Sequence, residues 1–186
     1  MSDWKLISEA TASGASSVEF TDLTGFKIFK WVFIDVNPAT DLTRFNFQVN
    51  ADGQTGFNET ITSTYFDTYH YESGDPYGPE LRYVASQDQA QGTSYQNLTA
   101  GLGGNADECC AGEIFLYHPE STTYVKHFYA TVNSVYSAQG ADSAATYNTY
   151  IGGYINNAAS AITAIDFKMT SGTFSGLIKQ YGLVAS

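Results

Sequence analysis

A nearly continuous apolar pattern runs from residue 25 to residue 41, GFKIFKWVFIDVNPATD. Successive side chains of a β-strand point to opposite faces of the sheet, so this run has two faces. One face carries Phe29, Trp31 and Phe33. The other face carries Ile28, Lys30, Val32 and Ile34. Lysine is almost never fully buried without a partner, so the face with Lys30 is predicted to point outward and the aromatic face into the core.

Apolar and polar residues alternate strictly at RFNFQVN, residues 44–50, which predicts a strand with one buried and one solvated face. Nine further short segments are rich in strand-forming residues and are separated by Gly, Pro, Asn, Asp and Ser. They are WKLISEA, SVEFTDL, TITSTYFDTYHY, ELRYVAS, GEIFLYH, TYVKHFYATVNSVY, TYNTYIGGYI, ITAIDFKM and FSGLIKQYGLV. The sequence therefore predicts an all-β fold, a two-sheet sandwich of jelly-roll type with about 11 strands and at most one or two short helices.

The connections contain typical turn residues, such as the Asp-Gly pair of NADGQTG. Residues 100–112 are a predicted loop. Residues 137–146 suit a short helix or a crossover of small residues, and residues 156–165 suit either a helix or a strand. Neither a repeat nor a linker divides the chain, so residues 1–186 are expected to form one β-sandwich domain.

The charge balance narrows the range of partners. The chain has 8 basic and 19 acidic residues and a net charge of −11, which argues against nucleic acid because the phosphate backbone would repel it. The longest apolar stretch, WVFI, is far shorter than the roughly 20 residues that cross a bilayer, so no membrane segment is expected. The first residues, MSDWKLISEA, lack the basic and apolar regions of a signal peptide, which predicts synthesis in a cytosol.

Motifs for catalysis or cofactor binding are missing from the sequence: it has no G-x-S-x-G, H-E-x-x-H, phosphate loop or dinucleotide fingerprint. We therefore expect no enzyme activity, no cofactor and no metal site. A polysaccharide-degrading enzyme stays a distant third alternative, because paired carboxylates cannot be recognised from their spacing. The adjacent Cys109 and Cys110 are interpreted as two reduced structural thiols, with a metal or redox role as the alternative.

The densest aromatic and polar stretch is TYFDTYHYESGDPY, residues 64–77. Tyr65, Tyr69 and Tyr71 fall on one face of a strand that leads into a loop containing Tyr77. Such a group could stack on sugar rings or contact another protein. Tyrosines also fill sandwich cores with their hydroxyl groups at the rim, and the sequence leaves both interpretations open.

Fragments at both ends of the chain resemble a known class of proteins. They are WKLISEATASGASSVEFTDL, then VFIDVNPATD followed by the Asp-Gly turn, and finally ITAIDFKMTSGTFSGLIKQYGL. These fragments are similar to β-sandwich domains of bacteriophage virion structural proteins on capsid surfaces, head appendages and tail fibres; the likeness fades between Tyr65 and Thr146. The resemblance implies a structural role in a virion and no catalytic residues.

Within that class, a compact domain with no shaft fits a capsid decoration or cement protein better than a tail fibre. The main hypothesis is therefore a decoration protein that binds and stabilises the shell of the major capsid protein. It would lie on the capsid surface of the virion after synthesis in the host bacterial cytoplasm. The alternative is a carbohydrate- or receptor-binding module of an appendage or tail fibre, in which a host glycan would bind the four tyrosines.

The outward face of the strand at residues 25–41 is the predicted contact surface. Each of its three aliphatic side chains would gain about 1.5–3 kcal/mol from full burial, so something is expected to cover them. Either loops of the same chain at 100–112 or 137–146 do so, or a neighbouring subunit does, since extended apolar patches mark interfaces. In the second case we expect contact with the major capsid protein and self-association, for example as a trimer. The predicted partner-binding residues are Ile28, Lys30, Val32 and Ile34.

Overall fold

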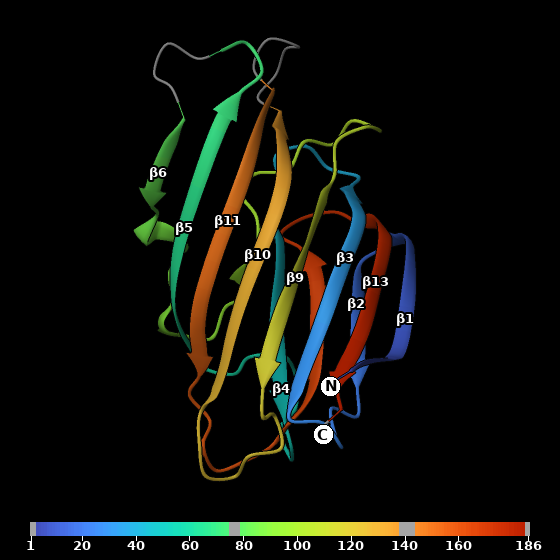
Figure 1. Cartoon of the computed structure of the whole chain (residues 1–186), viewed down its shortest axis with the longest axis vertical. Coiled ribbons are helices and arrows are strands. Elements are labelled where there is room, and N and C mark those ends of the chain that lie inside the picture. The colour runs from blue at the N-terminus through green and yellow to red at the C-terminus, as the bar shows by residue number, and fades with distance from the viewer. Residues whose placement is uncertain (1–2, 75–78, 138–143, 185–186) are drawn as a thin grey trace.

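The computed structural model describes residues 3–74, 79–137 and 144–184, and within them the chain is built almost entirely of strands (Figure 1). The strands are β1 (Trp4–Ala15), β2 (Ser17–Thr21), β3 (Ile28–Pro38), β4 (Phe45–Ala51), β5 (Ile61–Tyr71), β6 (Glu80–Tyr83), β7 (Ala90–Gly92), β8 (Gln96–Asn97), β9 (Cys110–Tyr117), β10 (Lys126–Ser137), β11 (Ala144–Ile155), β12 (Ile162–Met169) and β13 (Phe174–Leu183). The one helical element in these residues is a short 3-10 turn, Ala85–Gln87.

The strands form two antiparallel sheets that pack face to face, which confirms the predicted all-β sandwich. The larger sheet has nine strands in the order β1-β13-β3-β9-β10-β11-β5-β6, with β7 also paired to β5. The smaller sheet has four strands in the order β2-β12-β4-β8. In Figure 1 the larger sheet faces the viewer and the smaller sheet lies behind its right half. The left half of the larger sheet therefore extends beyond the smaller one.

Each of the eleven predicted segments contains a strand of the structure, but the predicted number is too low because the described part of the chain has thirteen strands. The two that the sequence pattern missed are β7 and β8, which are three and two residues long. A period of two residues cannot be recognised in so short a segment. Residues 156–161 form a loop that leads into β12, and most of the 137–146 segment lies outside the described residues.

The core lies between the sheets and is dominated by aromatic rings. Phe29, Trp31 and Phe33 are all buried, and Lys30 points to the opposite side of β3, as the pattern predicted. Phe167 of β12 contacts both the Trp31 and the Phe33 ring from the smaller sheet. The lysine therefore correctly predicted which face of β3 points outward.

Strand β4 differs from the prediction because both of its faces are buried. The polar side of RFNFQVN was expected in water, yet Asn46 is 4% and Gln48 is 0% exposed. The Gln48 amide donates hydrogen bonds to the carbonyl oxygens of Glu59, Thr93 and Ser94. Loop segments thus cover this face of the smaller sheet and replace the water that the alternating pattern had suggested.

The overhanging part of the larger sheet is covered on its inner side by the segment that follows the 3-10 turn. Thr149 of β11 donates its hydroxyl hydrogen to the carbonyl of Leu98 at 2.6 Å, and Ser63 of β5 donates to the Gln96 amide oxygen at 2.6 Å. Leu98 and Leu102 are fully buried here. The start of the predicted 100–112 loop therefore lies against the inner side of the sheet and not over the outer face.

Candidate functional site

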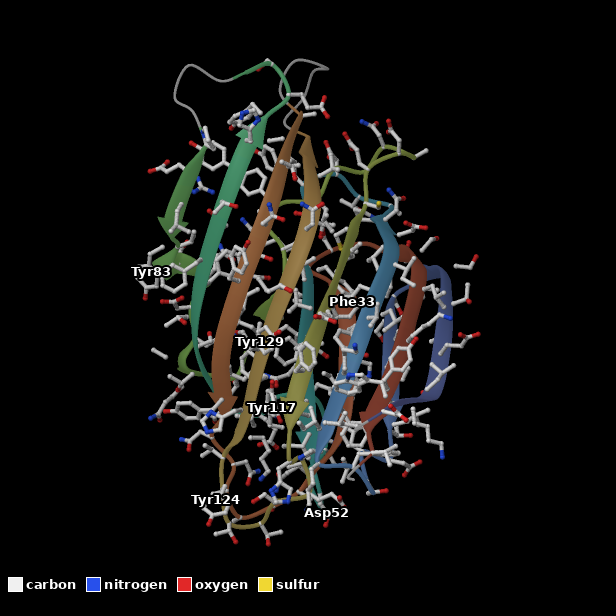
Figure 2. All side chains as sticks on the ribbon, in the orientation of Figure 1. Phe33, Asp52, Tyr83, Tyr117, Tyr124 and Tyr129 are labelled. Atoms are coloured by element: carbon white, nitrogen blue, oxygen red, sulfur yellow. The ribbon has the colours of Figure 1, made fainter. Side chains whose placement is uncertain are left out.

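The outer face of the nine-stranded sheet, turned away from the smaller sheet, carries a row of large side chains. Strand register places Tyr181, Lys30, Phe115 and Tyr129 beside one another on β13, β3, β9 and β10. The next position in the row, on β11, is Gly152, where an added Cβ would meet no atom within 4 Å. Tyr129 can be followed on this face in Figure 2. The row therefore crosses five neighbouring strands.

Further aromatic and aliphatic side chains extend this row in both directions. We call the complete set the outer aromatic face, and it consists of Trp4, Leu6, Lys30, Phe66, Tyr83, Phe115, Tyr117, Tyr129, Tyr150 and Tyr181. Tyr150 is 47%, Phe66 is 40% and Tyr83 is 56% exposed. Phe66 and Tyr83 contact each other with ring centroids 5.2 Å apart. Exposed side chains of this size on adjacent strands form a contiguous apolar surface.

Lys30 lies in the middle of this surface, surrounded by rings. Its Nζ is 4.5 Å from the ring centroid of Trp4 and 5.7 Å from those of Phe115 and Tyr181. The carboxylate of Glu113 lies 3.7 Å from the same nitrogen. Each such cation–π contact stabilises by about 0.5–1 kcal/mol at an exposed site. The positive charge is thus held in place and balanced within the face.

The rings of the outer aromatic face stack mainly on one another. Phe115 and Tyr129 are nearly parallel, with centroids 4.9 Å apart and planes at 3°. Tyr117 also stacks on Phe115, with centroids 6.4 Å apart and planes at 20°. Rings stacked in this way cover each other's flat faces and turn their edges outward. Such a ridge suits the side chains of a protein partner better than the flat face of a sugar ring.

A shallow hollow of about 330 Å³ adjoins the ridge on the outer face. Tyr150 borders it, and the amides of the exposed Asn133 and the half-buried Asn148 supply its polar part. These two amides are joined by a hydrogen bond of 3.0 Å. The outer face thus combines a projecting ridge with a neighbouring depression, which is the relief expected of a contact surface.

The predicted partner-binding residues lie on this same face. Ile28, Val32 and Ile34 are half-buried, and Val32 lies between Lys179 and Glu113. The aromatic members of the face come from seven other strands, so the pattern of β3 alone could not reveal them. Alternation within TYVKHFYATVNSVY was the available signal for Tyr129, but it did not tell which side of β10 would face outward.

The charges on the outer face cancel, whereas the chain as a whole is strongly acidic. Lys30 pairs with Glu113, and Lys179 pairs with Glu9 at 3.1 Å. The net charge of the chain is −11. Depletion of unbalanced charge together with enrichment of aromatic residues is characteristic of the centre of a protein interface. The outer face therefore differs from the rest of the surface in the way that interfaces do.

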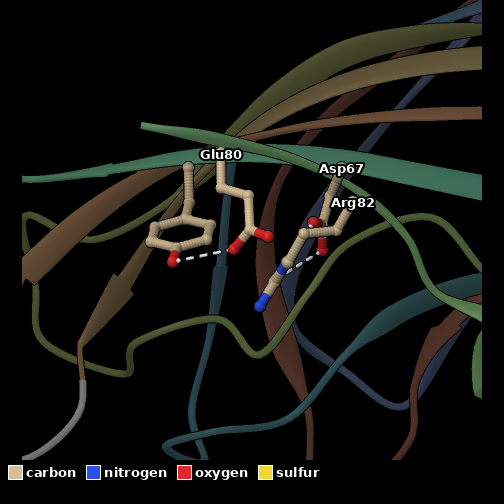
Figure 3. Close-up of polar contacts among 4 residues, drawn as sticks. Asp67, Glu80 and Arg82 are labelled. Atoms are coloured by element: carbon tan, nitrogen blue, oxygen red, sulfur yellow. Dashed lines mark hydrogen bonds and ion pairs between the residues drawn. The ribbon is translucent and has the colours of Figure 1, made fainter. Parts of the chain in front are cut away.

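The alternative tyrosine site lies on the inner side of the overhanging sheet. Tyr65, Tyr69 and Tyr71 do share one face of β5, but Tyr65 is only 1% exposed. The Tyr69 ring stacks on Tyr147 at 5.5 Å, and its hydroxyl group donates to Glu80 (Figure 3). Tyr77 lies outside the described residues. The three described tyrosines are therefore packed among other side chains.

Both cysteines are free thiols in the structure. Cys110 is buried in the core, and burial raises the pKa of its thiol. His118 contacts Lys27 with 2.6 Å between Nε2 and Nζ, while His127 packs on Tyr154. In the part of the chain that the structure describes, no three His, Cys, Asp or Glu side chains are grouped as metal ligands.

Helices long and apolar enough to cross a membrane are likewise not found among the described residues. Comparison with known proteins adds no relative: no protein-family model matches the chain, and no match is found among curated proteins.

Proposed function

We propose that this protein is a non-catalytic structural component of a bacteriophage virion, a decoration or cement protein that binds the major capsid protein through its outer aromatic face. The observation that carries the proposal is the contiguous, charge-balanced aromatic surface around Lys30 on an acidic domain. The sequence resemblance to virion β-sandwich domains supports the choice of partner. Such a protein works by adding buried area between shell subunits, which stabilises the particle without chemistry.

The wrapping of the chain supports a jelly-roll type of sandwich within this proposal. The connections β1–β2, β3–β4, β8–β9 and β12–β13 each pass from one sheet to the other. The crossing pairs also lie side by side, since β13 and β12 contact β1 and β2 on one flank and β3 and β4 on the other. A ribbon of paired strands that wraps around the core in this way is typical of jelly rolls.

Self-association is a second part of the proposal and involves the edge of the larger sheet. Strand β1 is the terminal strand of that sheet, and most of its side chains are exposed, including Trp4, Leu6 and Ile7. A long edge strand offers unpaired backbone groups to another strand. Contact between copies at this edge would extend the outer face from one protomer to the next, as in a ring around a symmetry axis.

The Val32→Glu substitution tests the outer face as the capsid contact. The new carboxylate would lie between Lys179 and Glu113, so attraction to the first offsets repulsion from the second and the free energy of unfolding should change by less than about 1 kcal/mol. Binding to capsids should weaken by roughly 100-fold or more, because the contact would enclose an unpaired charge. Co-sedimentation with purified capsids that lack this protein measures the binding, and urea unfolding measures the stability.

Thr55→Glu is the matched control, since it adds the same charge at an exposed loop position after β4. It should leave both capsid binding and stability unchanged. Equal capsid binding by the wild type and the Val32→Glu variant would show that the outer face is not the contact. Failure of the wild-type protein to bind any capsid, together with a low copy number in purified particles, would contradict the decoration role itself.

A further inference from the structure

The chain contains only two arginines, Arg44 and Arg82, and both line one pocket. Arg44 immediately precedes β4 of the smaller sheet, whereas Arg82 lies on β6 at the far edge of the larger sheet. The pocket has a volume of about 170 Å³ and lies on the inner side of the overhanging strands. Its remaining walls come from Tyr65, Asp67, Val84, Gln87, Ala100, Gly101, Tyr136 and Tyr147.

Arg82 is held in a fixed orientation. Its Nε and Nη2 donate to the two carboxylate oxygens of the buried Asp67, each at 2.8 Å (Figure 3). Its guanidinium carbon lies 4.6 Å from the ring centroid of Tyr69 and 5.6 Å from that of Tyr147. The hydrogen bonds with Asp67 raise the pKa of Arg82 further. The bidentate pair with Asp67 and the two neighbouring rings leave the guanidinium little freedom. It is therefore fixed at the pocket before any ligand binds.

Arg44 has no such partner. Among the described residues no carboxylate lies within ion-pair distance of it, and its Nε is buried without a hydrogen-bond acceptor. Asp67 is the one acidic residue that lines the pocket, so two guanidinium groups face one carboxylate. One positive charge is therefore left unbalanced in a protein whose net charge is −11. An unsatisfied charged donor of this kind costs stability unless a ligand supplies the acceptor.

Tyr65 supplies a second unsatisfied donor. Its side chain is 1% exposed, and its hydroxyl group is buried with no hydrogen-bond partner among the residues that the structure describes. Burial raises the pKa of this phenol, so the hydroxyl keeps its proton near neutral pH and can donate it. Leaving a hydroxyl group unpaired in the interior costs about 1–3 kcal/mol. The pocket thus holds two unpaired donors, from Arg44 and Tyr65, around one excess positive charge.

We propose that this pocket binds a carboxylate, and that the carboxylate belongs to a sugar acid. One excess positive charge matches a single carboxylate, whereas a phosphate dianion would leave the site negative in an already acidic protein. A planar guanidinium also matches the two oxygens of a carboxylate. The aromatic walls of Tyr136 and Tyr147 and the amide of Gln87 suit the remaining ring and hydroxyl groups of a single sugar residue.

A glycine, Gly101, lines the pocket next to Tyr136. A Cβ at Gly101 would approach the Tyr136 ring to 3.1 Å, so a side chain there would press on this wall. The site lies on the inner side of the larger sheet, opposite the outer aromatic face. Ligand binding here and capsid binding there can therefore succeed or fail independently of each other.

The test is a titration of the full chain with glucuronate, glucose, glutamate and inorganic phosphate, followed by calorimetry and by thermal unfolding. Glucuronate should bind and raise the melting temperature, whereas glucose and phosphate should not. Arg44→Gln should weaken glucuronate binding by roughly 10- to 100-fold, since it removes a charged donor. Lys5→Gln, at an exposed position on β1, makes the same change in net charge and should leave binding unaffected.

Tyr65→Phe provides a second variant with opposite expected effects. Removal of the unpaired hydroxyl should raise the melting temperature of the free protein and weaken glucuronate binding by about 10-fold. Glutamate binding as tight as glucuronate, and lost in Arg44→Gln, would support the carboxylate site but overturn the sugar acid as its source. Equal glucuronate binding by the wild type and Arg44→Gln, or no binding of either carboxylate by the wild type, would overturn the site.

Discussion

Replacing Trp31 with alanine should lower the free energy of unfolding by about 3–5 kcal/mol, because the change opens a large cavity between the sheets. The indole is fully buried and contacts the rings of Phe29, Phe20 and Phe167 at centroid distances of 6.0, 6.4 and 6.1 Å. These neighbours belong to both sheets and cannot collapse into the space together. Urea unfolding of the isolated protein measures the loss.

Trp31→Phe is the matched control. It keeps an aromatic ring in the cavity and removes an indole N–H that has no hydrogen-bond partner in the described part of the chain, so its cost should be clearly smaller than that of alanine. A loss below about 1 kcal/mol for Trp31→Ala would show that this ring does not fill a packed core. The contrast with Val32→Glu, which should spare stability and remove capsid binding, separates the two faces of β3.

Stability should fall steeply above pH 10. Burial raises the pKa of Tyr147 to about 12 and also raises the pKa values of Tyr65, Tyr95 and Cys110. Their ordinary values apply in the unfolded chain, which therefore releases these protons first as the pH rises. The folded state then holds more protons than the unfolded state, and each group lowers the free energy of unfolding by about 1.4 kcal/mol per pH unit.

Lys126 has the opposite effect on the free energy of unfolding, and it acts at lower pH than the tyrosines. Burial lowers the pKa of its buried ammonium group, so the unfolded chain holds this proton more tightly and stability rises until about pH 10.5, the ordinary lysine value. Above that value the opposing contribution of Lys126 ends, and the buried tyrosines and Cys110 act together to lower the free energy of unfolding.

Urea unfolding at a series of pH values measures this dependence. Tyr65→Phe should reduce the slope above pH 10 by about 1.4 kcal/mol per pH unit, because it removes one of the titrating groups. Stability that stays constant to pH 12 in the wild type would contradict the burial of these phenols.

Each of the eleven segments recognised in the sequence contains a strand, because a strand produces a pattern that neighbouring residues alone reveal. Alternation of side chains between two faces needs only neighbouring residues, and a single lysine sufficed to orient β3 correctly. The same signal failed at β7 and β8, which are too short to alternate. It was also misleading at β4, because loops distant in sequence cover the polar face with Asn46 and Gln48.

The candidate sites are harder to predict from local sequence patterns than the strands are. Of the outer aromatic face, the sequence identified only Lys30, since the register that places Tyr129 beside Phe115 joins strands whose pairing depends on the whole sheet. Tyr65 and Tyr69 were correctly assigned to one face of a strand. That this face is the inner one, and that Tyr65 is buried, depends on the width of the larger sheet and on the segment packed against it.

The sequence by itself therefore determined the fold class, the positions of the long strands and the core side of β3, because each depends on residues within a few positions of one another. The tertiary structure decided which side chains meet. Arg44 and Arg82 are unremarkable in the sequence, and they share a pocket only because the start of β4 and the edge strand β6 converge at the overhang of the larger sheet. Such convergence arises from long-range packing of the two sheets, which no short stretch of sequence contains.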